Sequence, residues 1–468
     1  MPAELPESGS AAAPAGATAE PTQASIAALL RRIADGRWDR DESAAHAGRD
    51  GEGGGPPTSA RLLGPSAPAQ AESRSAPDGA TGTRAPLPGV AYLLPGLPEE
   101  GSGGSHSLVQ EARGLRNLGA TARICVPAGS LRTATGLYGE EDQLFTTYRS
   151  DATSPGVSDA SLLDAVAGAD VVVASEYPSV ELLARLRRER PEIVCAYYVQ
   201  DYEPLFTEPR SSRSDRALLS YRAIPGQLLF AKSAWLCSLV SELHLLPVVK
   251  VAPSLDQELF HAGGRSESHG PLRIAAMIRP RTPRRRPLAT LQSLAEIHAA
   301  LGEDAEILTF GCDAGSFALL QQQAPASGTH LGLLNRSEVA ELMRRCDVFI
   351  DASAYQAFGR TGLEAMACGA VPLLPALGGV HEYALDGENA LILADASPEE
   401  IAAAIVALAR ERPRLDQMRR AGVLAARAFS IERAARSQLE LFSAALARRH
   451  VERGAATDRD GYEHITPA

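Results

Sequence analysis

The most informative part of the sequence runs Asp351-Ala-Ser-Ala-Tyr-Gln-Ala-Phe-Gly-Arg-Thr-Gly-Leu-Glu-Ala-Met-Ala-Cys-Gly-Ala-Val-Pro372. It follows an apolar run at Val348–Ile350 that predicts a buried strand, and its second half predicts a helix. Gly359 and Gly362 have no Cβ, so a ligand can approach the backbone closely there. These glycines alone would fit an ordinary turn between strand and helix, but the whole string indicates a binding turn.

The start of the predicted helix has the physical properties of an anion site. Unpaired N–H groups at a helix opening at Gly362 would combine with the helix dipole to attract a diphosphate. Glu364 lies in the first turn, where its carboxylate can accept two hydrogen bonds from a ribose diol. The turn therefore predicts a nucleotide diphosphate site, with a simple capping role for Glu364 as the alternative.

The same alternation of apolar runs and amphipathic segments extends on both sides of this turn. It predicts two successive parallel sheets, each covered by helices on both faces. Before residue 254, strands are expected at Val90–Leu94, Ala122–Val126, Val171–Ala174, Ile193–Val199, Leu236–Val240 and Val248–Ala252, and helices at Ser107–Leu118 and Val180–Arg188. After residue 270, strands are expected at Arg273–Ile278, Glu306–Phe310, Leu331–Leu334, Val348–Ile350, Val371–Leu374 and Leu391–Leu393, and helices at Leu288–Leu301, Glu338–Arg345 and Glu399–Arg410.

Composition shifts predict the domain boundaries. The Ala-, Gly-, Pro- and Ser-rich segment 1–86 is expected to be disordered, apart from a short helix at Ala24–Asp35. Residues 87–253 and 271–430 are expected to be Rossmann-like domains, joined by a linker at 254–270. A C-terminal helix at 431–450 and a flexible tail at 451–468 complete the expected organisation.

Composition also limits the function classes. The 468-residue chain has a formal net charge of −11, which disfavours a general nucleic-acid binder. Six cysteines without CxxC spacing predict buried free thiols in a reducing cytosol and not a zinc site. We find no signal peptide and no apolar stretch of about 20 residues, the length that spans a membrane. The expected location is cytoplasmic, with peripheral contact at the inner membrane face through helices such as Glu181–Arg190 as a less favoured option.

The Asp351–Pro372 stretch resembles the signature of retaining GT-B glycosyltransferases of the family-4 type. These enzymes carry Glu, seven residues and a second Glu, with Phe-Gly between them, and they fold into two Rossmann-like domains facing across a cleft. The second Glu corresponds to Glu364, whereas the first corresponds to Gln356, a departure. The resemblance implies that the donor is bound by Gln356, Phe358, Gly359, Arg360, Thr361, Gly362 and Glu364.

Two further stretches are similar to the same family. Met277-Ile-Arg279-Pro-Arg-Thr-Pro-Arg284-Arg285 follows the first strand of the second domain, where relatives place an Arg and a Lys that hold the diphosphate. Arg279 and Arg284 would fill these catalytic roles, with Arg285 as an alternative register for the second. Fixed cations there would stabilise the leaving group. Gly103 and Gly104, in the loop that ends at His106, correspond to a Gly-Gly loop facing the donor. For His106, a catalytic role toward the acceptor or sugar and a capping or surface role fit the sequence equally well.

The string Val199-Gln200-Asp201-Tyr202-Glu203-Pro204 is similar to a subgroup of rhamnosyltransferases that use dTDP-rhamnose. Many relatives have a His near C6 of the donor sugar where Gln200 stands. Asp201 would bind a sugar or acceptor hydroxyl, or would simply end the strand. The resemblance implies front-face transfer of a hexosyl or 6-deoxyhexosyl group to an acceptor hydroxyl with retention. No dense Asp/Glu/His cluster suggests a metal, so we expect no metal and no cofactor beyond the nucleotide sugar.

Two other functions fit parts of the sequence, and a third fits it poorly. A nucleotide-sugar epimerase shares the architecture, and Gln356 suggests a catalytically silent scaffold subunit. A nucleotide-binding oxidoreductase would need Gly-x-Gly-x-x-Gly after the first strand, which Gly101–His106 does not match. The acceptor is open between a glycan, a lipid-linked intermediate and a small molecule.

Overall fold

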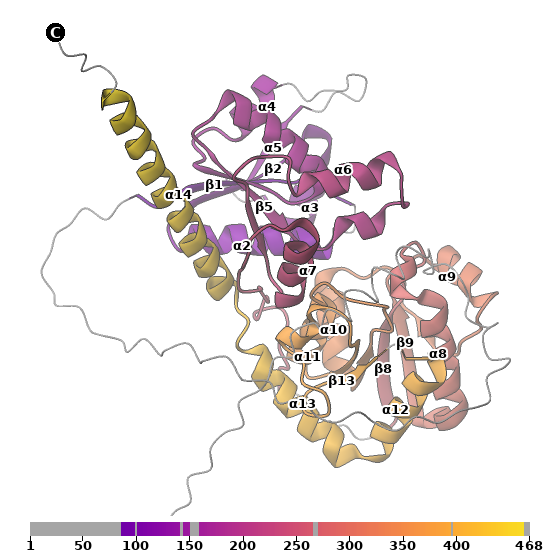
Figure 1. Cartoon of the computed structure of the whole chain (residues 1–468). Coiled ribbons are helices and arrows are strands. Elements are labelled where there is room, and N and C mark those ends of the chain that lie inside the picture. Colours follow the sequence, from indigo (N-terminus) through magenta and orange to yellow (C-terminus); the bar gives the residue numbers. More distant parts are fainter. Residues whose placement is uncertain are drawn as a thin grey trace, which may run out of the picture. The chain divides into compact units, whose positions relative to one another are not determined.

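The computed structural model describes residues 86–98, 101–140, 144–149, 159–264, 270–394 and 396–462, without the side chains of residues 159 and 452–462. The predicted N-terminal extension up to residue 85, including Ala24–Asp35, and residues 463–468 lie outside this range. Figure 1 shows two sheets with helices packed against them.

The first sheet has seven strands in the order β3-β2-β1-β4-β5-β6-β7, and all neighbours pair in parallel. Continuous apolar runs form its centre: every residue of β1, β4 and β5 is buried. The strands are β1 (Gly89–Leu93), β2 (Thr121–Pro127), β3 (Phe145–Tyr148), β4 (Val171–Ala174), β5 (Val194–Val199), β6 (Leu228–Ala231) and β7 (Val248–Lys250). Their helices are α2 (Gly103–Asn117), α3 (Leu131–Tyr138), α4 (Asp159–Ala165), α5 (Tyr177–Glu189), α6 (Ser212–Ser220) and α7 (Ala234–His244).

Alternate residues of these strands feed two separate cores, as the strand period of two requires. In β1, Ala91 and Leu93 pack with α4, α5 and α7, whereas Val90 and Tyr92 pack with α2. The second of these cores also receives Phe442 from the C-terminal helix α14 (Ile431–Tyr462), which runs beside α2 (Figure 1).

The second sheet has six parallel strands in the order β10-β9-β8-β11-β12-β13. The strands are β8 (Leu272–Met277), β9 (Ala305–Phe310), β10 (Thr329–His330), β11 (Val348–Ile350), β12 (Val371–Pro375) and β13 (Leu391–Leu393). Their helices are α8 (Pro287–Leu301), α9 (Ala314–Gln321), α10 (Arg336–Arg345), α11 (Arg360–Ala367), α12 (Pro398–Arg410) and α13 (Arg412–Ala426). Helices α8 and α12 cover one face, and α10 and α11 cover the other.

The prediction of two doubly wound parallel sheets is confirmed. In both sheets the first strand lies beside the fourth, so the strand order reverses there. In such folds ligands bind outside the carboxyl ends of the strands at this reversal. The loops that follow β1, β8 and β11 are therefore the ones placed to bind a ligand.

Several predicted elements are wrong. Leu236–Val240 belongs to helix α7 and not to a strand, because Ser233 caps the helix and the apolar run packs as a helix face. Residues 331–334 follow strand β10 and are not in it. The C-terminal helix continues to Tyr462, past the predicted end at 450 and into the predicted tail.

None of the six cysteines, all of which lie in the described ranges, forms a disulfide bond, as predicted. All are buried except Cys237, which is partly exposed. In the part of the chain that the structure covers, no helix has the length and apolar character needed to cross a membrane.

Candidate functional site

Loops from both sheets contact one another at the carboxyl ends of their strands. The loop between β1 and α2, the ends of β5 and β6, the loop after β8 and the turn between β11 and α11 all contribute polar side chains. Side-chain hydrogen bonds join the two halves directly, for example from Arg360 to Gln110 and from Ser233 to the carbonyl of Ala357. The predicted site residues lie along this junction.

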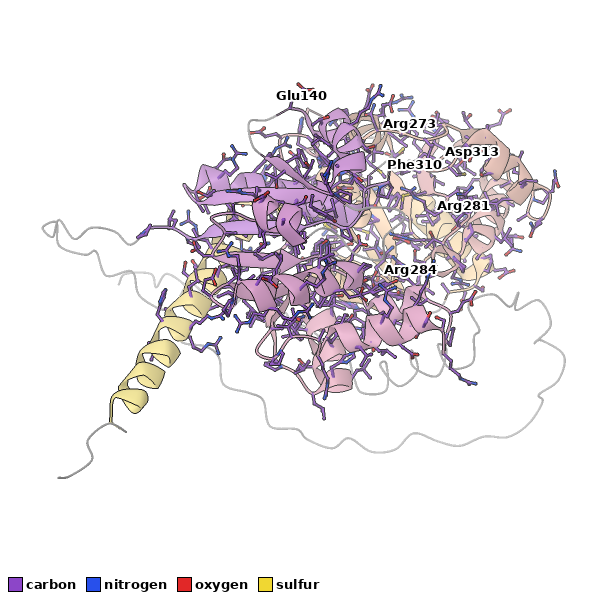
Figure 2. All side chains as sticks on the ribbon, turned by 90° about the horizontal axis from the view of Figure 1, so that it is seen from above. Glu140, Arg273, Arg281, Arg284, Phe310 and Asp313 are labelled. Atoms are coloured by element: carbon purple, nitrogen blue, oxygen red, sulfur yellow. The ribbon has the colours of Figure 1, made fainter. Side chains whose placement is uncertain are left out.

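Arg284 lies after β8, in the short 3-10 turn Pro283–Arg285. Figure 2 labels this residue and Arg281. Its guanidinium is 3.3 Å from the carboxylate of Asp201, at the end of β5. The guanidinium carbon also lies 5.0 Å from the ring centre of Phe206 and 5.1 Å from that of Tyr355. Its Nε and Nη1 are buried without a hydrogen-bond partner among the described residues. Two donors of a fixed, stacked guanidinium therefore remain for a ligand.

Arg279 and Arg285 flank this position differently. Arg279 is half-buried, and its charge acts on His106 together with those of Arg336 and Arg360. Arg285 pairs with the buried carboxylate of Asp351 at 3.4 Å. Of the two registers left open by the sequence, Arg284 is the one with buried donors that have no partner among the described residues, whereas Arg285 pairs with Asp351.

Gln356 is buried and tied to its own turn. Its Nε2 donates to Asp351 at 2.6 Å and to Ser353 at 3.2 Å. Its backbone forms a bridge with Gly378. The position therefore still has a carboxylate beside it, because Asp351 accepts a hydrogen bond from the Gln356 amide.

Helix α11 begins at Arg360, two residues before the predicted opening at Gly362. Gly359 caps it with a φ of 81°, a left-handed conformation that favours glycine, and its carbonyl accepts a hydrogen bond from Tyr383. The Gly362 N–H donates to the Gly359 carbonyl at 3.0 Å. Contrary to the prediction, it is therefore not an unpaired hydrogen-bond donor for an anion. A Cβ at Gly362 would lie 2.6 Å from Leu374, so this glycine serves close packing.

Arg360 and Glu364 form the first turn of α11. Arg360 donates to Glu364 at 3.5 Å, to Gln110 at 3.1 Å and to the Ser107 hydroxyl at 2.5 Å. Burial raises the pKa of Glu364, and the charges of Arg360 and Arg336 oppose that rise. Between them, Thr361 is partly exposed. Arg360 thus reaches from the second sheet to helix α2 of the first.

Gly103 and Gly104 are the first two residues of α2, which Ser102 caps through a hydrogen bond from the Ser105 N–H. A Cβ at Gly104 would lie 3.0 Å from Nε2 of Gln200. A Cβ at Gly103 would lie 3.9 Å from Cδ of Arg360. The absence of side chains here thus lets the helix start approach the end of β5.

His106 hydrogen-bonds through Nδ1 to the Tyr138 hydroxyl at 2.7 Å. Burial, followed by the charges of Arg336, Arg360 and Arg279, lowers its pKa to about 3. The imidazole is therefore neutral at physiological pH and is oriented by its tyrosine partner. His106 therefore lies near the charges of Arg336, Arg360 and Arg279 and does not act as a proton donor at neutral pH.

Gln200 and Asp201 follow β5, as predicted. Asp201 accepts a hydrogen bond from the Tyr202 N–H at 2.8 Å, which fits its strand-end interpretation, and it also pairs with Arg284. The side-chain amide oxygen of Gln200, Oε1, is buried without a hydrogen-bond partner among the described residues. Phe358 is buried and packs edge-on against Tyr383 at 5.5 Å.

Sequence reasoning missed three polar residues of this junction: Lys232, Arg336 and Ser107. Lys232 follows β6, and only its rarity in an Arg-rich chain could have drawn attention to it. Arg336 is the first residue of α10 and lies 3.5 Å from Asp256. Among the residues that the structure describes, no group of three or more His, Cys, Asp or Glu side chains is placed to hold a metal ion.

Part of the chain matches a known protein family. Residues 274–423 match the family described as glycosyl transferases group 1. The chain is similar to D-inositol 3-phosphate glycosyltransferase of Segniliparus rotundus, with 26% identity over 42% of this chain and 46% of that protein. It is also similar to the O-antigen biosynthesis protein RfbC of Myxococcus xanthus, with 30% identity over 44% of this chain and 16% of that protein. The chain thus spans less than half the length of these curated relatives.

Solved structures share the fold. Sucrose-phosphate synthase from Thermosynechococcus elongatus superposes with a TM-score of 0.61 at 15% identity, over 77% of this chain and all of that one. HepE of Anabaena, in complex with UDP-glucose, superposes with a TM-score of 0.62 at 14% identity, over 76% of this chain and all of that one. At these identities the likeness concerns the fold, which is the two-domain GT-B arrangement of Rossmann-like units.

Proposed function

We propose that this protein is a retaining glycosyltransferase that moves a glycosyl group from a nucleotide diphosphate sugar to an acceptor hydroxyl. One observation carries the proposal: at the carboxyl edge of the second sheet, two buried donor atoms of Arg284 have no hydrogen-bond partner among the residues that the structure describes. A guanidinium kept in this state is suited to a polyanion. The match of residues 274–423 to the glycosyl transferase family supports the same assignment.

The proposed chemistry needs orientation and charge, not a protein nucleophile. As the bond between sugar and diphosphate breaks, negative charge grows on the leaving oxygen, and Arg284 and Arg279 stabilise it. That oxygen then takes the proton of the acceptor hydroxyl, which attacks from the same face. Asp201 and the two aromatic rings hold the Arg284 guanidinium in place for this step. No metal is required in this scheme.

For the donor, we propose a 6-deoxyhexose such as rhamnose on a nucleotide whose ribose hydroxyls face Glu364. By the family resemblance, Gln200 stands where many relatives would place a His near C6 of the donor sugar, and a 6-deoxy sugar has no hydroxyl there for such a His to contact. The acceptor is proposed to be a hydroxyl of a growing cell-surface glycan, in line with the O-antigen name of one relative. The reaction would then take place in the cytoplasm.

The test begins with a donor screen by thermal unfolding, using dTDP-rhamnose, UDP-glucose and GDP-mannose. A donor at one hundred times its dissociation constant adds about 2.7 kcal/mol to the free energy of unfolding. Arg284→Met should then lower kcat for transfer about 10²- to 10³-fold, the usual effect of losing one preorganised donor. Arg281→Met, on the same loop but exposed, is the matched control and should stay within about twofold of wild type.

Three results would count against the proposal. If no nucleotide sugar stabilised the protein, there would be no donor site. If an epimerised sugar formed without an acceptor, the protein would be an isomerase. Equal activity of Arg284→Met and Arg281→Met would show that the leaving group lies elsewhere. Preference for UDP-glucose or GDP-mannose over dTDP-rhamnose would end the 6-deoxyhexose assignment alone.

A further inference from the structure

Lys232 is a buried cation at the junction of the two sheets. It follows strand β6, and only 5% of its surface is exposed. Its Nζ donates to the Ser107 hydroxyl of α2 at 2.9 Å. The same Nζ lies 5.7 Å from the ring centre of Tyr198 and 5.7 Å from that of Phe358. The ammonium is thus enclosed by groups of both sheets.

No carboxylate of the described residues lies within ion-pair distance of this ammonium. The charges of Glu111, Asp201 and Glu364 reach it only through space, and each is hydrogen-bonded or paired elsewhere. Burying a cation without a direct counter-ion is costly. A site that keeps such a charge is suited to a ligand of opposite charge.

A second cation converges on the same atom. Arg360 donates through Nη2 to the Ser107 oxygen at 2.5 Å, and the Ser107 hydroxyl itself donates to the Gly103 carbonyl at 3.1 Å. One small hydroxyl therefore serves two cations from opposite halves of the chain. Their proximity has a cost: burial, followed by the Arg360 charge, lowers the pKa of Lys232 to about 8. An anion between them would relieve both penalties.

We propose that Lys232 and Arg360 bind a phosphate group jointly, and that Ser107 holds the two side chains in position for it. This proposal rests on the proposed function. It adds Lys232, a cation from the first sheet, to Arg279 and Arg284 in the loop after β8. The arginine can grip two phosphate oxygens, while the lysine acts as a point charge. The starts of α2 and α11, at Gly103 and Arg360, add favourable dipoles. The phosphate belongs either to the donor diphosphate or to the acceptor.

The chain contains only two lysines, Lys232 and Lys250, which makes a direct test available. A sample labelled with ¹³Cε-lysine gives two side-chain NMR signals, and Lys250→Arg identifies the one from Lys232. We expect this signal to titrate near pH 8 in the free protein. Saturation with a nucleoside diphosphate (UDP, GDP or dTDP) should move its midpoint to pH 9 or above, about the shift that tenfold tighter binding to the ammonium form requires.

The ligands distinguish the two sources of phosphate. Movement with the nucleoside diphosphate but not with the nucleoside assigns the phosphate to the donor. Movement only after inositol phosphate is added to the diphosphate-saturated protein assigns it to the acceptor. The inference is overturned if the Lys232 titration stays unchanged although thermal unfolding shows that the nucleotide is bound, and if it also stays unchanged after inositol phosphate is added. If no nucleotide binds, the proposed function fails, and titration with pyrophosphate still decides the role of Lys232.

Variants give an independent readout. Lys232→Met should weaken nucleoside diphosphate binding at least tenfold at pH 7, whereas Lys250→Met, which removes the same charge from an exposed site, should change it less than twofold. Wild-type affinity should fall as pH rises through 8, because the ammonium loses its proton. Affinity of Lys232→Met should not show this fall. Equal affinity and an equal pH profile for wild type and Lys232→Met would contradict joint binding.

Discussion

Gln356 illustrates how a single residue changes meaning once its neighbours are known. From the sequence, it is a position where a charged carboxylate has been lost. In the structure, its amide donates to Asp351, and Arg285 pairs with the same carboxylate. The negative charge is thus present beside the position, carried by a residue five places earlier. The amide and the carboxylate have complementary hydrogen-bonding roles, so the two positions depend on each other.

Restoring a carboxylate with Gln356→Glu should therefore destabilise the protein by about 1–3 kcal/mol at pH 8, because two buried acceptors would face each other without a donor. The loss should shrink at acidic pH: the new carboxyl has a raised pKa in the folded state, so a retained proton stabilises the fold until pH rises through that pKa. Adding Asp351→Asn should recover stability. A urea-unfolding double-mutant cycle measures this coupling, and additive single effects would refute it.

Other residues of the site were beyond sequence reasoning for a physical reason. Lys232 and Ser107 are 125 positions apart, and Arg360 and Ser107 are 253 apart. Such pairs carry no local signature, whereas Gly359, Glu364 and Arg284 lie in compact strings with recognisable spacing. Local spacing therefore predicted the turns at the carboxyl ends of the strands, but it could not show which side chains find hydrogen-bond partners within the protein.

Elements were predictable where local pattern and burial agree. Strands Val171–Ala174, Val348–Ile350 and Leu391–Leu393 have the predicted bounds. Helix α7 was mistaken for a strand because its apolar run is short and nearly continuous. Its start depends on Ser233 and on Glu382, whose carboxylate accepts from the Ala234 N–H at 2.7 Å. Glu382 is 148 positions away, so this second cap is invisible in the sequence.

The end of α7 is energetically unfavourable as it stands. Leu245 caps it with a φ of 51° and is 82% exposed. A leucine in the left-handed region costs about 1–2 kcal/mol, whereas glycine adopts it freely. Leu245→Gly should therefore raise the free energy of unfolding by about 0.5–1 kcal/mol in thermal or urea denaturation. Leu245→Ala keeps the strained φ and is the control, so an equal gain from both variants would place the effect in the side chain and not in the backbone.

At the scale of the whole described chain, the last helix packs back against the first sheet. Helix α14 follows the second sheet in sequence, yet Phe442 is buried in a core of the first sheet. Nearby, Gln438 donates to the fully buried Glu111 at 2.6 Å, and Glu111 also accepts from Ser254 in the segment between the sheets at 2.8 Å. The segment between the sheets and helix α14 thus meet at one carboxylate, a contact that the prediction of a C-terminal helix at 431–450 did not include.

This arrangement predicts that α14 stabilises a sheet far from it in sequence. Phe442→Ala should lower the free energy of unfolding by about 3–5 kcal/mol, the usual cost of emptying a large buried side chain. Because Phe442 packs against Phe230 of β6 with a ring separation of 5.6 Å, amide hydrogen exchange should accelerate first in β6 and its neighbours β5 and β7. Ser443→Ala, on the exposed face of the same helix, should leave exchange unchanged. Faster exchange confined to the second sheet would mean that α14 belongs energetically to the sheet it follows, and not to the sheet it covers.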